Sequence, residues 1–196
     1  MLDAARDSIQ LGTDANRDAG MLIEAAANSQ AAAFVEVRAG ARDVAERVLR
    51  DGIEELDRLG NLSYRGTTVL LLADLLAHRG AYEEAARWCA EVRDTLNDDD
   101  LTDVVAVETV EGFLTAASGA HDEGIRLSAR GVAVAATMDM YDQKGRAFEW
   151  HARTLALAGR RDEACDAAAT ALAIYEAKGD IPAIRWTRDL LQSLSA

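Results

Sequence analysis

Four glycines divide this sequence at nearly equal intervals. Gly40, Gly80, Gly119 and Gly159 each follow an apolar stretch with helical spacing and precede another, and the intervals are 40, 39 and 40 residues. Glycine readily adopts the left-handed conformation that ends a helix, so each glycine predicts a tight turn between two helices. A small residue follows each glycine by five positions, where bulk would hold two helix backbones apart. These small residues are Ala45, Ala85, Gly124 and Ala164.

The repeat predicts an all-α fold, a right-handed superhelical solenoid of antiparallel helix hairpins with a period of about 40 residues. We expect a single array over residues 1–196, without a linker or a second domain. The predicted hairpins cover residues 19–59, 64–97, 101–138 and 142–178, and a last helix covers 181–194. Pro182 fits the first turn of that last helix, because a missing N–H costs nothing there.

The segment 1–12 predicts a remnant helix of a preceding repeat. Leu2, Ala5 and Ile9 share one face, and Gly12 is expected to end this helix. A solenoid normally ends in a complete cap with a polar outer face, so we expect the chain to be the C-terminal part of a larger protein. We also expect an apolar inner face, with Leu22 and Phe34, that self-association or an upstream helix would cover.

The charge of the chain argues against two classes of partner. Its 34 acidic and 21 basic residues leave a net charge of −13, which disfavours nucleic acids and anionic membranes. No signal peptide is recognisable, and the longest apolar stretch, Val69–Leu76, is interrupted by Asp74 and too short to span a bilayer. We therefore expect a cytoplasmic protein.

No pattern of reactive residues predicts catalysis. Cys89 and Cys165 lie far apart without a CxxC motif, which indicates free thiols. His78, His121 and His151 lack the spacing of metal ligands, and His151 occupies a position where a buried, hydrogen-bonded histidine is expected. Phosphate-binding glycine motifs are also missing. The sequence predicts neither an enzyme nor a cofactor or metal site.

The stretch GAYEEAARW, residues 80–88, resembles the turn and second-helix start of a tetratricopeptide repeat. The usual repeat has about 34 residues, so longer helices or links are implied here. Residues 41–61, 131–140 and 171–180 resemble the arrays at the C-terminus of bacterial signalling ATPases, either nucleotide-cyclase-associated proteins or LuxR-type regulators. The resemblance implies ATPase or cyclase domains upstream. The array is not followed by a helix-turn-helix, which favours the cyclase-associated type.

In tetratricopeptide arrays the first helix of each hairpin lines a concave groove, and this implies a binding surface here. The candidate groove residues are Gln30, Phe34, Val37, Thr67, Leu70, Asp74, Thr109, Phe113, Arg146, Glu149 and Arg153. The last three recur at helical spacing, so two arginines could attract an acidic segment of a partner. The alternatives are an intrahelical Glu149–Arg153 pair, and groove residues that only pack between hairpins.

The sequence thus favours a non-catalytic protein-interaction and regulatory scaffold that binds a protein or peptide, with upstream domains of the same polypeptide among the candidate partners. One alternative is a free-standing adaptor that binds a peptide. Another is a sensor of a small ligand, which would require a polar pocket within the array.

Overall fold

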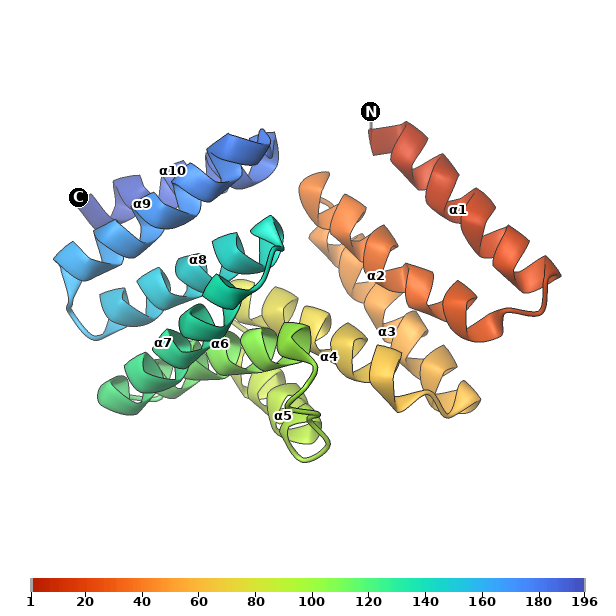
Figure 1. Cartoon of the computed structure of the whole chain (residues 1–196), viewed down its shortest axis with the longest axis horizontal. Coiled ribbons are helices and arrows are strands. Elements are labelled where there is room, and N and C mark those ends of the chain that lie inside the picture. Colours follow the sequence, from red (N-terminus) through yellow and green to blue (C-terminus); the bar gives the residue numbers. More distant parts are fainter. Residues whose placement is uncertain (1, 196) are drawn as a thin grey trace. The chain divides into compact units, whose positions relative to one another are not determined.

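The computed structural model describes residues 2–195, and this part of the chain forms ten α-helices joined by short turns, without a strand. The prediction of an all-α fold is confirmed (Figure 1). The helices are α1 (Leu2–Asp18), α2 (Leu22–Arg38), α3 (Arg42–Leu59), α4 (Leu62–His78), α5 (Tyr82–Arg93), α6 (Leu101–Ala117), α7 (His121–Thr137), α8 (Tyr141–Leu157), α9 (Arg161–Lys178) and α10 (Ile181–Ser195).

The predicted glycine turns are present. Gly40, Gly80, Gly119 and Gly159 all have a positive φ, and so do Gly20, Gly60 and Gly179 between the predicted hairpins. At Gly40 the glycine N–H donates to Val37 O at 3.0 Å, and the next N–H, of Ala41, donates to Glu36 O at 2.9 Å. This pair of bonds is the Schellman motif, which satisfies the last carbonyls of a helix and needs a left-handed residue.

Two predicted helix ends are wrong. The first helix does not end at Gly12 but continues to Asp18, and Gly20 makes the turn. Gly12 lies within regular helix and does not end it. The helix predicted to reach residue 97 ends at Arg93, because the run Asn97–Asp100 forms the link to α6, where the Asp100 side chain accepts from the Asp103 N–H.

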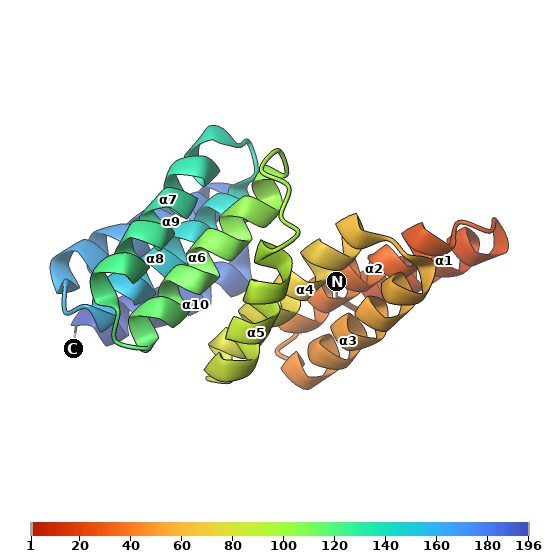
Figure 2. The ribbon, with the colours of Figure 1, turned by 90° about the horizontal axis from the view of Figure 1, so that it is seen from below.

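The chain divides into two compact units, Met1–Gly80 and Ala81–Ala196. The sequence predicted a single array, and the division falls in the turn of the predicted hairpin 64–97. In the first unit, α2 lies between α1 and α3, as Figures 1 and 2 both show. In the second unit, α6 pairs with α7 and α8 with α9, and α10 packs on α9. Leu190 and Leu194 of α10 join a cluster with Leu155 of α8 and Ala168 of α9.

Three second helices of hairpins, α3, α7 and α9, bury the same four positions. We call the fourth, eighth, eleventh and fifteenth residues of such a helix its ridge. All ridge residues of α3, α7 and α9 are buried. They are Ala45, Leu49, Gly52 and Leu56 in α3, Gly124, Ser128, Gly131 and Ala135 in α7, and Ala164, Ala168, Ala171 and Tyr175 in α9. Their spacing places them on one stripe, and most are small, so the paired helices approach closely.

Two ridge glycines show how close this approach is. A Cβ built on Gly131 would lie 2.5 Å from Cγ2 of Thr109 on α6, and one on Gly124 would lie 2.5 Å from the carbonyl oxygen of Gly112. Neither position has room for a larger residue without displacement of α6. Gly112 on α6 is equally crowded, with the Ser128 backbone nitrogen 2.6 Å from its Cβ position.

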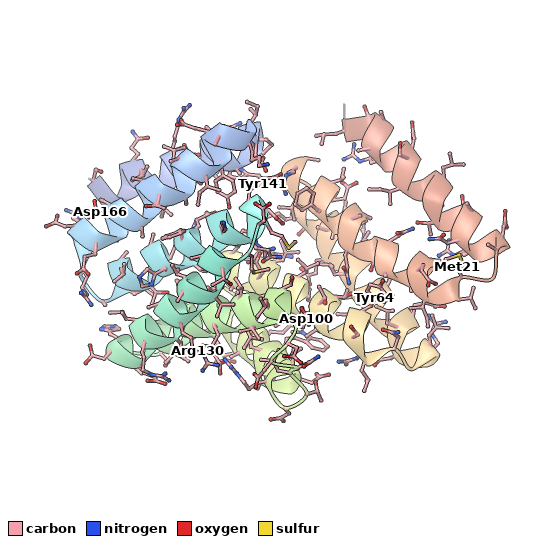
Figure 3. All side chains as sticks on the ribbon, viewed as in Figure 1. Met21, Tyr64, Asp100, Arg130, Tyr141 and Asp166 are labelled. Carbon is pink, nitrogen blue, oxygen red and sulfur yellow. The ribbon has the colours of Figure 1, made fainter. Side chains whose placement is uncertain are left out.

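A buried ion pair joins α5, α6 and α7. The side chain of Glu108 on α6 has no exposed surface, and its Oε1 lies 2.7 Å from Nη1 of Arg93 on α5. Arg130 on α7, labelled in Figure 3, approaches the same oxygen to 3.5 Å. Arg93 also donates from Nε to Glu111 at 3.0 Å. A carboxylate withdrawn from water requires such partners, because an isolated buried charge is very unfavourable.

Loss of Arg93 should therefore be costly. We expect Arg93→Ala to lower the free energy of unfolding by about 3 kcal/mol, because it leaves the buried Glu108 carboxylate without its nearest cation. Urea unfolding followed by circular dichroism measures the change. Arg126→Ala, which removes an exposed pair with Glu123, should cost much less, because water screens that pair. Equal losses in the two variants would contradict the role of the Arg93 pair.

Substitution of glycine by alanine at the eleventh helix position should change stability in opposite directions in α7 and α1. Gly131→Ala should destabilise the chain by about 1–3 kcal/mol, because the added methyl group would meet Thr109. Gly12 is the eleventh residue of α1, and its Cβ position has nothing within 4 Å. Gly12→Ala should therefore stabilise the chain by about 0.5–1 kcal/mol through helix propensity alone. Thermal unfolding of the two variants checks both signs.

Candidate functional site

The predicted groove residues fall into the two units and are described for each. The first unit contains Gln30, Phe34 and Val37 of α2 and Thr67, Leu70 and Asp74 of α4, and the second contains Thr109 and Phe113 of α6 and Arg146, Glu149 and Arg153 of α8. Leu70 and Thr109 are 2% exposed, so they contribute packing rather than accessible surface.

In the first unit, Gln30 of the predicted groove joins two helices, whereas Thr67 donates to Ser63 O and Asp74 lies near His78 within α4 itself. Gln30 Nε2 donates to Tyr64 O at 3.1 Å and to Thr68 Oγ1 at 3.0 Å, which ties α2 to the start of α4. Phe34 is 39% exposed. The guanidinium carbon of Arg38 lies 3.3 Å from the centroid of the Phe34 ring, a cation–π contact. The exposed ring is therefore partly covered by an arginine of the same helix.

In the second unit, aromatic residues of three helices form a row. Tyr82 of α5 meets Phe113 of α6 edge to face, with ring centroids 5.5 Å apart. Phe113 in turn packs on Trp150 of α8, with centroids 4.8 Å apart. The Arg153 guanidinium carbon lies 5.8 Å from the Trp150 ring centroid. We call Tyr82, Phe113, Trp150 and Arg153 the aromatic row.

The aromatic row is buried in its middle and accessible at both ends. Phe113 and Trp150 are buried, whereas Tyr82 is 42% exposed and the Arg153 side chain 30% exposed. The two accessible ends carry a phenolic hydroxyl and a guanidinium, both hydrogen-bond donors. The buried rings beneath them restrict their movement. Such a row presents polar groups on a rigid apolar support.

The three charged residues of α8 share a face, as predicted. Arg153 Nη2 lies 3.2 Å from Glu149 Oε1, so the predicted intrahelical pair is present. Arg146, Trp150 and Arg153 follow at intervals of four and three residues, which places both arginines on the stripe of α8 that carries Trp150. Glu149 is buried and Arg146 half-buried.

Sequence reasoning missed two members of the aromatic row. Tyr82 follows Gly80 by two residues and stands in the sequence only as part of the repeat motif GAYEEAARW. Nothing in the sequence spacing of Trp150 indicates that its neighbours include Phe113. The spacing in the sequence could have indicated Trp150 as a neighbour of the predicted arginines, since it lies one helical turn after Arg146.

His151 is hydrogen-bonded, as predicted. Its Nδ1 lies 2.8 Å from Oγ of the buried Ser128, across the α7–α8 contact. Burial of the ring lowers the pKa of His151, and the positive charge of Arg160 acts in the same direction, while Glu163 opposes it. Ser128 is fully buried, so its hydroxyl serves packing between helices and has no access to a substrate.

The other candidate chemistries find little support in the described residues. Over residues 2–195, no three His, Cys, Asp or Glu side chains gather as a metal site requires. Cys89 and Cys165 are free thiols. A cavity of about 270 Å³ lies between α1 and α2, where Arg6 is already hydrogen-bonded to Glu36 and Asp3. Among these helices none combines the length and apolar character needed to cross a bilayer.

Comparisons with known proteins show the fold. No protein-family profile and no curated protein sequence matches the chain. BtubC (BKLC) from P. vanneervenii is similar in structure, with a TM-score of 0.58 and 12% identity over 100% of this chain and 91% of that one. A putative kinesin light chain from P. anserina with nearly identical TPR-like repeats has a TM-score of 0.50 and 17% identity over 91% of this chain and 98% of that one. The predicted tetratricopeptide-like repeat fold is therefore confirmed.

The half-buried His151 should make the stability of the folded chain depend on pH. Because the folded chain lowers the pKa of His151 below its usual 6.5, the unfolded chain binds a proton more readily, and stability should fall as the pH drops below about 6.5. His151→Gln should remove this component of the acid loss. Thermal unfolding between about pH 7.5 and 5 compares the variant with wild type. The control is His121→Gln, at an exposed position, which should keep the wild-type profile.

Proposed function

We propose that this chain is a protein-interaction scaffold that binds an acidic segment of a partner protein at the aromatic row of the second unit. The observation that carries the proposal is the row itself, which joins α5, α6 and α8 and exposes Tyr82 and Arg153 at its ends. Arrays of helical repeats commonly offer extended binding surfaces, which is the use proposed for the row.

The composition of the row suits a binding surface. Tyrosine, tryptophan and arginine are the residues that most often dominate binding energy at protein interfaces. Here the buried rings of Phe113 and Trp150 hold the accessible groups in place, so a partner would meet a preorganised surface. Preorganisation matters because less side-chain freedom is lost on binding.

The charge of the α8 stripe suggests an acidic partner. Arg146 and Arg153 lie on this stripe in a chain whose net charge is −13. A guanidinium presents a planar pair of donors that matches a carboxylate. Glu149 neutralises part of this charge, so we expect one or two acidic side chains in the bound segment, next to an apolar residue that contacts the exposed ring of Tyr82.

A random peptide display library selected on the full chain provides the test. Selected peptides should be enriched in Asp and Glu, and their affinity is then measured by calorimetry. Arg146→Ala with Arg153→Ala should weaken binding by about 1.5–3 kcal/mol, roughly tenfold to a hundredfold. The matched control, Arg126→Ala with Arg188→Ala, removes the same charge from exposed pairs with Glu123 and Glu176. Similar losses in the two double variants, or peptides without acidic residues, would refute the proposed site.

We further propose that the array works within a larger bacterial signalling ATPase or regulator. This rests on the resemblance of residues 41–61, 131–140 and 171–180 to the arrays of such proteins. The genomic reading frame that contains this sequence provides the test, because an ATPase module encoded in the same frame supports the proposal. A frame that encodes only helical repeats favours the free-standing adaptor.

A further inference from the structure

The accessible end of the aromatic row carries a carboxylate of its own chain. Nη2 of Arg153 lies 3.2 Å from Oε1 of Glu149, one turn earlier on α8. Within residues 2–195, Glu149 is the hydrogen-bond partner of Arg153. The Arg153 side chain is 30% exposed, whereas that of Glu149 is only 11% exposed. A negative charge is therefore held directly beside the guanidinium that we propose for an acidic partner.

The Arg153 guanidinium can be reached by a partner only at its terminal nitrogens. Its Nε is buried and has no hydrogen-bond partner among residues 2–195. A carboxylate of the partner would accordingly approach end-on, toward Nη1 and Nη2, because a guanidinium also offers a planar pair of donors on that side. Since Nη2 already contacts Glu149, the two carboxylates would share one cation. Two like charges at such close range repel each other.

The burial of Glu149 makes this repulsion effective. Helix α8 packs against α6, α7 and α9, as Figure 1 shows, and leaves the Glu149 side chain little contact with water. Water and salt screen a charge less where the surrounding protein excludes solvent. Glu123 on α7 is exposed and is screened far more. Glu149 is thus placed to influence which anionic groups bind at Arg153.

We propose that Glu149 determines the anionic group that the aromatic row accepts, namely the carboxylate of Asp or Glu rather than the phosphate of a phosphorylated residue. This inference rests on the proposed function, because it concerns the same site. A carboxylate carries one negative charge, whereas the phosphate of phosphoserine carries about −1.5 to −2 at pH 7. Repulsion by Glu149 therefore acts more strongly on the phosphate. Without Glu149, Arg146 and Arg153 would favour the more highly charged group, because arginine pairs with both.

The test compares two synthetic peptides by calorimetry with the full chain at neutral pH. The first is a display-selected peptide that contains glutamate at the position where alanine weakens binding most. The second carries phosphoserine at that position. Wild type should bind the glutamate peptide more tightly. Glu149→Gln should strengthen binding of both peptides, and the ratio of phosphoserine to glutamate affinity should rise at least about threefold, because the lost repulsion was greater for the phosphate.

Two further variants separate the charge of Glu149 from its contact with Arg153. Glu149→Asp keeps the charge but shortens the side chain, so the affinity ratio should stay within about twofold of wild type. The matched control, Glu123→Gln, removes the same charge from an exposed pair with Arg126. It should also leave the ratio within about twofold of wild type. Circular dichroism establishes that each variant keeps its helices.

An affinity ratio that Glu149→Gln leaves unchanged, or that Glu123→Gln raises equally, would overturn the role of Glu149. So would a wild-type preference for the phosphoserine peptide. Weaker binding of the glutamate peptide by the Glu149→Gln chain would also overturn it, because Glu149 would then hold Arg153 in place rather than oppose the charge of the partner.

The double variant Arg146→Ala with Arg153→Ala distinguishes failure of this inference from failure of the proposed function. If the double variant binds the glutamate peptide as wild type does, the proposed site is wrong, and the role of Glu149 fails with it. If the double variant binds weakly while Glu149→Gln leaves the ratio unchanged, only the role of Glu149 is wrong.

Discussion

Close contact between two helix backbones is the interaction on which each complete hairpin of this chain depends. Two helices approach closely where their facing side chains are small, and most ridge positions of α3, α7 and α9 meet this condition. The glycine turns add the second constraint, because they set the distance along the chain at which each helix reverses. Together, the small ridges and the glycine turns explain why an alanine-rich sequence with few aromatic residues forms an ordered core.

The aromatic row departs from this packing of small side chains between paired helices. Large aromatic residues occur where three helices meet, and there the row from Tyr82 to Arg153 reaches the surface. The corresponding residues of α1, Ala5, Ile9, Gly12 and Asn16, are only half-buried. On α10, Arg185, Arg188 and Gln192 form an exposed polar face instead of a small one.

The turn glycines and the small residues after them were sufficient to predict the fold, because both requirements are local in the sequence. Gly12 shows the limit of this reasoning. A glycine that ends a helix and one inside a helix look alike in a sequence, and only the regular positions of Gly20, Gly40 and Gly60 separate the two. The aromatic row could not be predicted in full, because Tyr82, Phe113 and Trp150 meet through helix packing rather than sequence spacing. The buried pair of Arg93 and Glu108 was missed for the same reason.

Hydrogen–deuterium exchange of the full chain, resolved by helix, tests the central claim that covered ridges hold the helices in place. The exchange rate of a helical amide reports how readily its segment opens, and opening is easier where little surface is buried against a neighbour. The account predicts that α7, whose ridge is fully buried by α6, exchanges slowly. Helix α1, in which no residue is buried, should exchange much faster despite its equal length. Equal protection of α1 and α7 in the isolated monomer would contradict the account.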